Sequence, residues 1–225
     1  MTRTPWEPGP ARPRLVAATV DVWCADLDEP AVRAAAHDVL DADERARAAR
    51  FAQPEAGARW AAARGVLRVL LAAHLDADPA AARLERGPHG KPRLAGEARL
   101  RFNLSHSRGV ALYALALDRE VGVDVELPRR AVDHVAIARR AFGDAEAERL
   151  AALEPPARER AFLRAWVRWE AALKCRGSGI GGAEVPAEGP QPWIRELELD
   201  GPGAAALAVA VGPVEVRCRR WSPAA

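Results

Sequence analysis

Two carboxylates on one short segment are the residues of this chain most suited to chemistry. In Val121–Leu127 apolar and polar residues alternate with a period of two, which predicts a β-strand with one buried face. On such a strand Asp124 and Glu126 point to the same side and repel each other, by roughly 2–4 kcal/mol at an effective dielectric near 20. A hard cation with oxygen ligands, Mg²⁺ before Ca²⁺, would relieve this repulsion. Water along an exposed sheet edge would relieve it too, so both interpretations stay open at this point.

A further carboxylate and a lysine lie on a predicted helix over residues 158–175. The spacing of Trp166, Glu170 and Lys174 is i, i+4, i+8, so the three share one helix face. Burial of the tryptophan would draw Glu170 toward the interior, where a carboxylate needs a metal or another cation. If this face packs on the acidic strand, Glu170 completes a site of three carboxylates and Lys174 lies beside a metal-bound phosphate. The alternative is a surface Glu–Lys pair worth a few tenths of a kcal/mol.

A histidine flanked by serines stands at a predicted strand end, in Phe102–Ser107. Serine hydroxyls, backbone N–H groups and an imidazolium suit phosphate binding. A nucleophile–base pair of Ser105 and His106 is disfavoured, because neighbouring residues on a strand point apart and the chain lacks a G-x-S-x-G elbow. An ordinary structural turn remains the alternative.

The chain contains 31 arginines but only two lysines, Lys91 and Lys174. Arginine and lysine are not equivalent where a compact point charge is needed, which suggests specific roles for both lysines. Lys91 stands in the turn Gly90-Lys91-Pro92, where it could meet an anionic or aromatic ligand. A plain turn is the alternative interpretation.

The composition is that of a globular protein without membrane spans. The chain has 225 residues, 49% hydrophobic and 28% charged, and contains no run of 18 apolar residues. A net charge of +2 argues against a strongly basic nucleic-acid binder. Three cysteines without metal or redox spacing, and a start that lacks an apolar signal segment, favour a cytoplasmic protein with reduced thiols.

Hydrophobic periodicity and turn residues predict an α+β fold of two similar halves. Each half has a strand, a short basic helix ending near Arg-Phe, a long helix bearing Trp and Arg, a glycine-containing loop and more strands. We expect the halves to be residues 1–118 and 119–225, with a ligand site at their seam. Strands are expected over 15–23, 101–107, 110–117 and 121–127, with two or three more in 193–221. Helices are expected over 41–50, 54–75 and 133–142. A further helix is expected to begin with Asp144 as its N-cap. Residues 1–14 and 177–189 are expected to be irregular.

Taken in order, three segments resemble the 4′-phosphopantetheinyl transferases of the surfactin-synthetase-activating type: Phe102–Ser107, Gly122–Glu126 and Trp166–Lys174. The Gly-Lys-Pro turn and the Arg-Phe segments fit as well, so the resemblance covers roughly residues 15–180. It implies a pseudo-twofold α+β monomer. It also implies a holo-acyl-carrier-protein synthase activity, in which the 4′-phosphopantetheine arm of coenzyme A passes to a serine of an acyl or peptidyl carrier protein and adenosine 3′,5′-bisphosphate is released.

The resemblance further implies roles for individual residues. The Mg²⁺ ligands would be Asp124, Glu126 and Glu170, with Mn²⁺ as an alternative ion. Glu146 matches a family carboxylate near the metal, which would contact the metal or help to deprotonate the serine; a first-turn glutamate favoured by the helix dipole is the alternative. Lys174 would touch the phosphates.

The coenzyme A contacts follow from the same resemblance. Ser105 and His106 match phosphate contacts, the segment Gly90, Lys91 and Pro92 matches the adenine and ribose side, and the candidates for the 3′-phosphate and its surroundings are Arg47, Arg59 and Arg64. One position departs from the family pattern, because Trp169 stands where many members have a lysine before the helix glutamate. The departure leaves the three carboxylates intact but puts the carrier preference in doubt.

Two other classes of function are weighed against the transferase. A different Mg²⁺-dependent enzyme acting on a nucleotide, such as a kinase or nuclease, would show a P-loop or more clustered acids, which this sequence lacks. The other class is a homologue that has lost its activity and serves only as a binding module. The chain retains all of the residues that catalysis would need, which counts against this class: Asp124, Glu126, Glu170 and Lys174.

Overall fold

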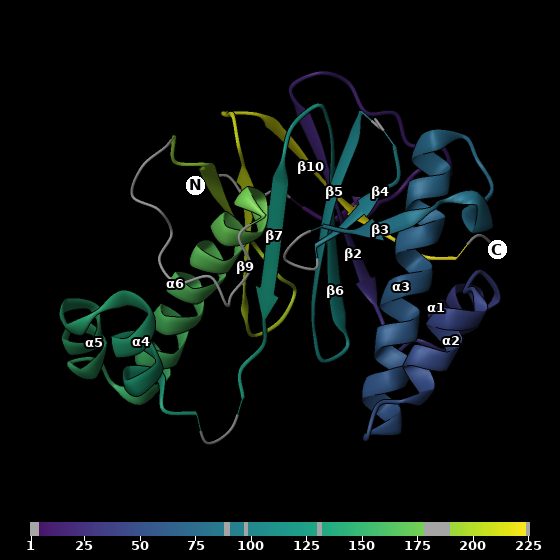
Figure 1. Cartoon of the computed structure of the whole chain (residues 1–225). Coiled ribbons are helices and arrows are strands. Elements are labelled where there is room, and N and C mark those ends of the chain that lie inside the picture. The colour runs from purple at the N-terminus through teal and green to yellow at the C-terminus, as the bar shows by residue number, and fades with distance from the viewer. Residues whose placement is uncertain (1–4, 88–90, 97–98, 130–131, 178–189, 224–225) are drawn as a thin grey trace.

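Two β-sheets lie between two groups of helices (Figure 1). The computed structural model describes residues 5–87, 91–96, 99–129, 132–177 and 190–223. None of the helices in these ranges combines the length and the apolar character that a membrane crossing requires. The fold is a mixed α+β arrangement, as the sequence predicts.

The first half of the chain forms one helical group and most of the larger sheet. Its helices are α1 (Pro30–Asp38), α2 (Ala42–Ala49), α3 (Pro54–Leu75) and the 3₁₀ turn η1 (Pro79–Ala81). Its strands are β1 (Glu7–Pro8), β2 (Thr19–Asp26), β3 (Leu84–Arg86), β4 (Pro92–Leu94), β5 (Leu100–Ser107) and β6 (Val110–Leu117). Strands β3 and β4 form a separate antiparallel pair.

The second half of the chain forms the other helical group, the smaller sheet and one strand of the larger sheet. Its helices are α4 (His134–Phe142), α5 (Asp144–Ala151) and α6 (Pro155–Arg176), and its strands are β7 (Val121–Glu126), β8 (Trp193–Leu197), β9 (Ala204–Val209) and β10 (Glu215–Arg220). The smaller sheet has the order β7-β9-β8, which matches the run β2-β6-β5 in the larger sheet of order β1-β10-β2-β6-β5. This match is consistent with an internal duplication, which remains a prediction, as does the division at residues 118 and 119.

Most predicted elements are present with small shifts at their ends. The strand expected from residue 15 begins instead at Thr19, because Ala18 has a φ of 60° and the Thr19 hydroxyl donates to the Val16 carbonyl at 2.8 Å in a turn. The N-cap of α5 is Gly143 rather than Asp144, whose carboxylate instead accepts a hydrogen bond from Arg139. The expected loop 177–189 lies almost wholly outside the described residues.

The local sequence does not predict which sheet the last strand joins. Strand β10 leaves the second half and pairs in parallel with β2 and β1 in the larger sheet. Its Val216 and Cys218 join a buried layer between the two sheets, together with residues such as Val22 and Val123. The larger sheet therefore contains strands from both ends of the chain, and the sheets share one apolar interior.

Helix α6 packs very closely on β7, and a glycine makes this approach possible. A Cβ on Gly122 would lie 2.1 Å from the Ala171 carbonyl oxygen and 2.4 Å from the Cys175 backbone nitrogen. Only a residue without a side chain fits between the strand and this helix turn. The close contact fixes the depth at which α6 presents its side chains to the strand.

We predict that Gly122→Ala lowers the free energy of unfolding by roughly 1–3 kcal/mol, because the methyl group forces α6 away from β7. Urea denaturation measures this change. The matched control is Gly201→Ala, since a Cβ there meets no atom within 4 Å. An equal loss of stability in the two variants would contradict the packing argument.

Candidate active site

Side chains of β5 join the two sheets along the seam between β5 and β7. Asn103 and Ser107 lie at alternate positions of β5 and are buried. The Asn103 side-chain oxygen accepts a hydrogen bond from the Val123 backbone N–H at 2.9 Å, and the Ser107 hydroxyl accepts one from the Leu127 N–H at 3.2 Å. Because β5 and β7 belong to different sheets, these side chains take the place of backbone pairing.

The same face of β5 holds the two carboxylates of β7. The Ser105 hydroxyl donates to Asp124 Oδ1 at 2.7 Å, and the Ser107 hydroxyl donates to Glu126 Oε2 at 2.9 Å. Asp124 and Glu126 thus lie on one side of their strand, as the alternation predicts. Asp124 is only 2% exposed, whereas Glu126 also pairs with Arg129 at 3.1 Å nearer the surface.

Helix α6 brings Lys174 and Glu170 to these groups. The Lys174 ammonium lies 2.5 Å from Asp124 Oδ1, 3.1 Å from Ser105 Oγ and 3.5 Å from Glu170 Oε2. Burial raises the pKa of Glu170 above its usual range, and the neighbouring charge of Asp124 acts in the same direction. The charge of Lys174 partly opposes this shift. The arrangement keeps a carboxylate of raised pKa beside a cation.

The aromatic residues of α6 form a cluster one turn before these groups. Trp166 stacks on Phe162 with ring centroids 5.7 Å apart and contacts Trp169 at 5.2 Å. Trp169 also meets the edge of Phe142 from α4 at 5.7 Å. Trp169, the residue that departs from the family pattern, therefore packs within this cluster.

The oxygen atoms at the seam have the chemistry of a hard-cation site. Asp124 Oδ2 is buried and has no hydrogen-bond partner among the described residues. Glu170 adds a second buried carboxylate, and carboxylate oxygens are the ligands that Mg²⁺ prefers. Across the described ranges, however, no three His, Cys, Asp or Glu side chains are grouped closely enough to hold a metal ion. In this arrangement Lys174 supplies the positive charge at Asp124, and the metal role of Asp124, Glu126 and Glu170 stays a prediction.

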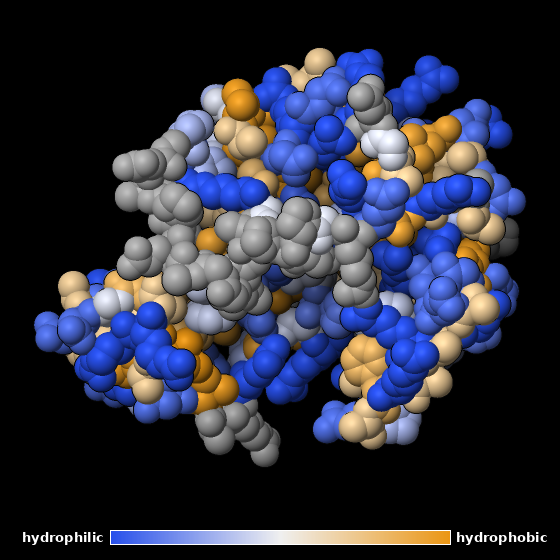
Figure 2. All heavy atoms as spheres, in the orientation of Figure 1, coloured by the Kyte–Doolittle hydropathy of each residue, from blue (hydrophilic) through white to orange (hydrophobic). Residues whose placement is uncertain are grey.

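A cavity of about 820 Å³ opens on the other face of β5. Arg47 and Arg64 line it from α2 and α3, and His106 lines it from β5. The Arg47 guanidinium lies 5.0 Å from the Trp60 ring centroid in a cation–π contact. Desolvation of its ring, and to a lesser degree the charge of Lys174, lowers the pKa of His106. In the view of Figure 2, hydrophilic side chains border the region between the two helical groups where grey atoms do not cover it.

Some predicted coenzyme A residues lie away from this cavity. Arg59 forms a two-pronged ion pair with Asp28, both contacts at 2.7 Å, and these hydrogen bonds lower the pKa of that carboxyl. Lys91 donates to Glu120 at 2.9 Å and to the Val121 carbonyl at 3.1 Å.

The remaining residues of the Gly-Lys-Pro turn are only partly described. Pro92 lines the 820 Å³ cavity as well as a neighbouring one of about 450 Å³ that includes Lys91. Gly90 lies outside the described residues. Pro92 therefore borders both cavities, and Lys91 borders the smaller one.

Glu146 lies in the first turn of α5, and this helix contacts α6. Its carboxylate accepts two hydrogen bonds from Arg149, at 2.6 and 2.7 Å, and these lower its pKa. No described contact joins Glu146 to Asp124 or Glu170, so a role near the metal stays a prediction.

Four residues near the site make contacts that the sequence did not predict. Asn103 and Ser107 flank Ser105 at a spacing of two, a pattern that could have identified one polar strand face. Asp41 and Glu44 carry the spacing of a helix capping box, but this spacing does not reveal that Glu44 is buried against Arg68.

Comparison with known proteins identifies the family. Residues 120–199, which carry the acidic strand and α6, match the model of the 4′-phosphopantetheinyl transferase superfamily. The chain is 35% identical over 228 residues to the 4′-phosphopantetheinyl transferase HetI of Nostoc sp., covering 93% of this chain and 95% of HetI. The chain belongs to the 4′-phosphopantetheinyl transferase superfamily. The resemblance drawn from the sequence motifs is thereby confirmed at the level of the superfamily.

Two further members of the superfamily are similar over shorter stretches. A putative 4′-phosphopantetheinyl transferase of Synechocystis sp., slr0495, is 33% identical over 72% of this chain and 66% of its own length. The transferase AcpT of Escherichia coli K12 is 37% identical over 40% of this chain and 47% of its own.

We predict that Asn103→Ala destabilises the protein by about 1–3 kcal/mol, because it leaves the buried Val123 N–H without an acceptor. Thermal or urea unfolding measures the loss. His106→Ala, on the opposite face of the same strand, should change the unfolding free energy by less than about 0.5 kcal/mol. Similar losses in the two variants would argue against the seam bond.

Proposed function

We propose that this protein transfers the 4′-phosphopantetheine arm of coenzyme A to a serine of an acyl or peptidyl carrier protein. The observation that carries the proposal is the buried group of Asp124, Ser105, Lys174 and Glu170 at the seam, in a chain that belongs to this superfamily. The carrier serine oxygen forms a new bond to the β-phosphorus of coenzyme A. The bond from that phosphorus to the bridging oxygen breaks, and adenosine 3′,5′-bisphosphate leaves.

We assign the Mg²⁺ ligands as Asp124, Glu126 and Glu170, with Mn²⁺ as an alternative. The unsatisfied buried oxygen of Asp124 and the raised pKa of Glu170 support a cation at this place. When bound, the ion would neutralise charge on the pyrophosphate. Lys174, which contacts Asp124 directly, is then free to turn its ammonium toward the phosphates.

The chain's own groups supply the remaining chemistry. Lys174 is a compact charge that stabilises the pyrophosphate as negative charge develops on the leaving oxygen. Glu170, whose pKa is raised by burial, is suited to accept the serine proton directly or through water. Glu146 is the second candidate for this base, although its ion pair with Arg149 lowers its pKa.

Coenzyme A would lie across β5, from the seam to the 820 Å³ cavity. Arg47, Arg64 and His106 line that cavity and suit the 3′-phosphate. The turn of Gly90, Lys91 and Pro92 suits the adenine and ribose side. Arg59 is bound to Asp28 and fits a structural role better than a phosphate contact.

We further propose a cytoplasmic monomer of the surfactin-synthetase-activating type, with halves 1–118 and 119–225. The matching strand orders β2-β6-β5 and β7-β9-β8 support the two-half organisation. The carrier would be a transient partner, and neither nucleic acid nor a membrane is expected to take part.

The direct test incubates the purified protein with coenzyme A, Mg²⁺ and an apo carrier, followed by intact-mass measurement. We expect the carrier to gain the mass of one phosphopantetheine arm. The assay should include fatty-acid, polyketide and peptide carriers, because the sequence does not specify the pathway. No gain on any of them would overturn the proposed function.

We predict that Asp124→Asn lowers transfer by more than about 100-fold, because removal of a metal ligand exceeds the 10–100-fold cost of second-shell changes. Chelation of Mg²⁺ by EDTA should stop transfer by the unaltered protein, and added Mg²⁺ should restore it. The control is Asp118→Asn, which alters a half-exposed carboxylate paired with Arg99 at the surface. Near-normal turnover of Asp124→Asn would remove this residue from the metal site.

A further inference from the structure

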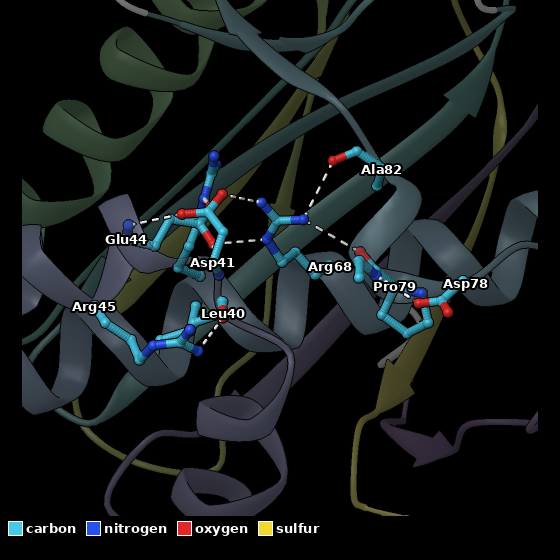
Figure 3. A network of polar contacts seen from close by, with 10 residues as sticks. Leu40, Asp41, Glu44, Arg45, Arg68, Asp78, Pro79 and Ala82 are labelled. Atoms are coloured by element: carbon cyan, nitrogen blue, oxygen red, sulfur yellow. Dashed lines mark hydrogen bonds and ion pairs between the residues drawn. The ribbon is translucent and has the colours of Figure 1, made fainter.

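A buried network of charged residues forms one wall of the 820 Å³ cavity (Figure 3). Its centre is Arg68 of α3, which is 5% exposed. The Arg68 guanidinium donates from Nε to Glu44 at 2.7 Å, from Nη2 to Asp41 at 2.7 Å, and from Nη1 to the Pro79 and Ala82 carbonyls at 3.2 and 3.3 Å. Every nitrogen of Arg68 already has an acceptor, so this arginine is a structural anchor rather than a ligand contact.

The network holds the carboxylate of Glu44 in a single orientation. Glu44 Oε2 accepts from Arg68 and from the Asp41 backbone N–H at 3.2 Å, and the Glu44 N–H donates back to Asp41 at 2.8 Å. Glu44 is only 6% exposed. A carboxylate bound from both its own helix start and the neighbouring helix has little freedom to turn.

The other oxygen of Glu44 holds Arg64. Glu44 Oε1 accepts a hydrogen bond from Arg64 Nε. Arg64 lines the cavity, and its two terminal nitrogens have no partner within the described parts of the chain. A guanidinium fixed through Nε presents its terminal nitrogens as a pair, which matches two oxygens of a phosphate.

We propose that Glu44 is a positioning residue that aims Arg64 at the 3′-phosphate of coenzyme A, with Arg68 as its anchor. The proposal rests on the proposed function, because it takes the 820 Å³ cavity as the place of that phosphate. Glu44 neutralises the buried Arg68 through one oxygen, and its negative charge by itself would weaken anion binding in the cavity. The proposed role concerns its other oxygen, which holds Arg64 at the cavity wall.

The charge of Glu44 and its proposed positioning role predict opposite changes in phosphate binding for one substitution. Glu44→Gln removes a negative charge beside the cavity, so electrostatics alone predicts tighter binding of the phosphate. The positioning role predicts weaker binding, because Arg64 loses the partner that fixes it. Glu44→Asp separates the two effects differently: it keeps the charge but withdraws the carboxylate by one methylene group.

The experiment compares coenzyme A with 3′-dephospho-coenzyme A, in calorimetric binding and in transfer to an apo carrier. We expect Glu44→Gln and Glu44→Asp each to reduce the preference for coenzyme A by about tenfold, the scale of one lost charge-assisted hydrogen bond. Binding of the dephospho compound should stay within about twofold of the unaltered protein. In an Arg64→Gln background, Glu44→Gln should cause no further loss, because its effect acts through Arg64.

The matched control is Asp43→Asn. Asp43 is exposed, lines the same cavity one residue away, and has no hydrogen bond or ion pair among the described residues. Its loss of charge should not reduce the preference for coenzyme A. Thermal unfolding of each variant identifies any that fails to fold, and Glu44→Asp, which retains the charge opposite Arg68, serves if Glu44→Gln does not fold.

Each outcome decides a separate point. Absence of transfer by the unaltered protein would overturn the proposed function itself. Transfer without preference for coenzyme A over its dephospho form would overturn the placement of the 3′-phosphate. A preference that is unchanged or increased in both Glu44 variants would overturn the positioning role while leaving the function intact.

Discussion

The contact of the Lys174 ammonium with Asp124 and Ser105 is the interaction on which the rest of the site depends. It joins α6, β7 and β5, three elements far apart in the chain, at one buried point. Without a cation, Asp124 and Glu170 would be two buried carboxylates facing each other, an arrangement that costs several kcal/mol. The close approach allowed by Gly122 brings the lysine within reach, so packing and electrostatics depend on one another.

Both lysines of this arginine-rich chain contact the same strand. Lys91 reaches Glu120 and the Val121 carbonyl at the start of β7, and Lys174 reaches Asp124 at its middle. A single ammonium fits between a carboxylate and a hydroxyl where a planar guanidinium would need a wider space. Arg68 shows the contrasting case, since each of its nitrogens meets a separate acceptor in the first half.

The two faces of β5 serve different parts of the site. Ser105 and Ser107 face the carboxylates of β7, whereas His106 faces the cavity with Arg47 and Arg64. One strand therefore separates the buried seam from the larger cavity. We propose that coenzyme A lies across this strand, with its pyrophosphate at the seam and its 3′-phosphate in the cavity.

Local patterns were enough to predict most elements of this protein and the orientation of its key side chains. Period-two alternation placed Asp124 and Glu126 on one side of a strand, and helical spacing put Glu170 and Lys174 on one face of α6, because these relations depend only on backbone geometry. Tertiary structure alone decided that β10 returns to the first sheet, that Asn103 bridges two sheets, and that Arg59 binds Asp28 instead of lining the cavity. Such contacts join residues tens to hundreds of positions apart, and their partners are selected by the packing of whole elements rather than by neighbouring residues.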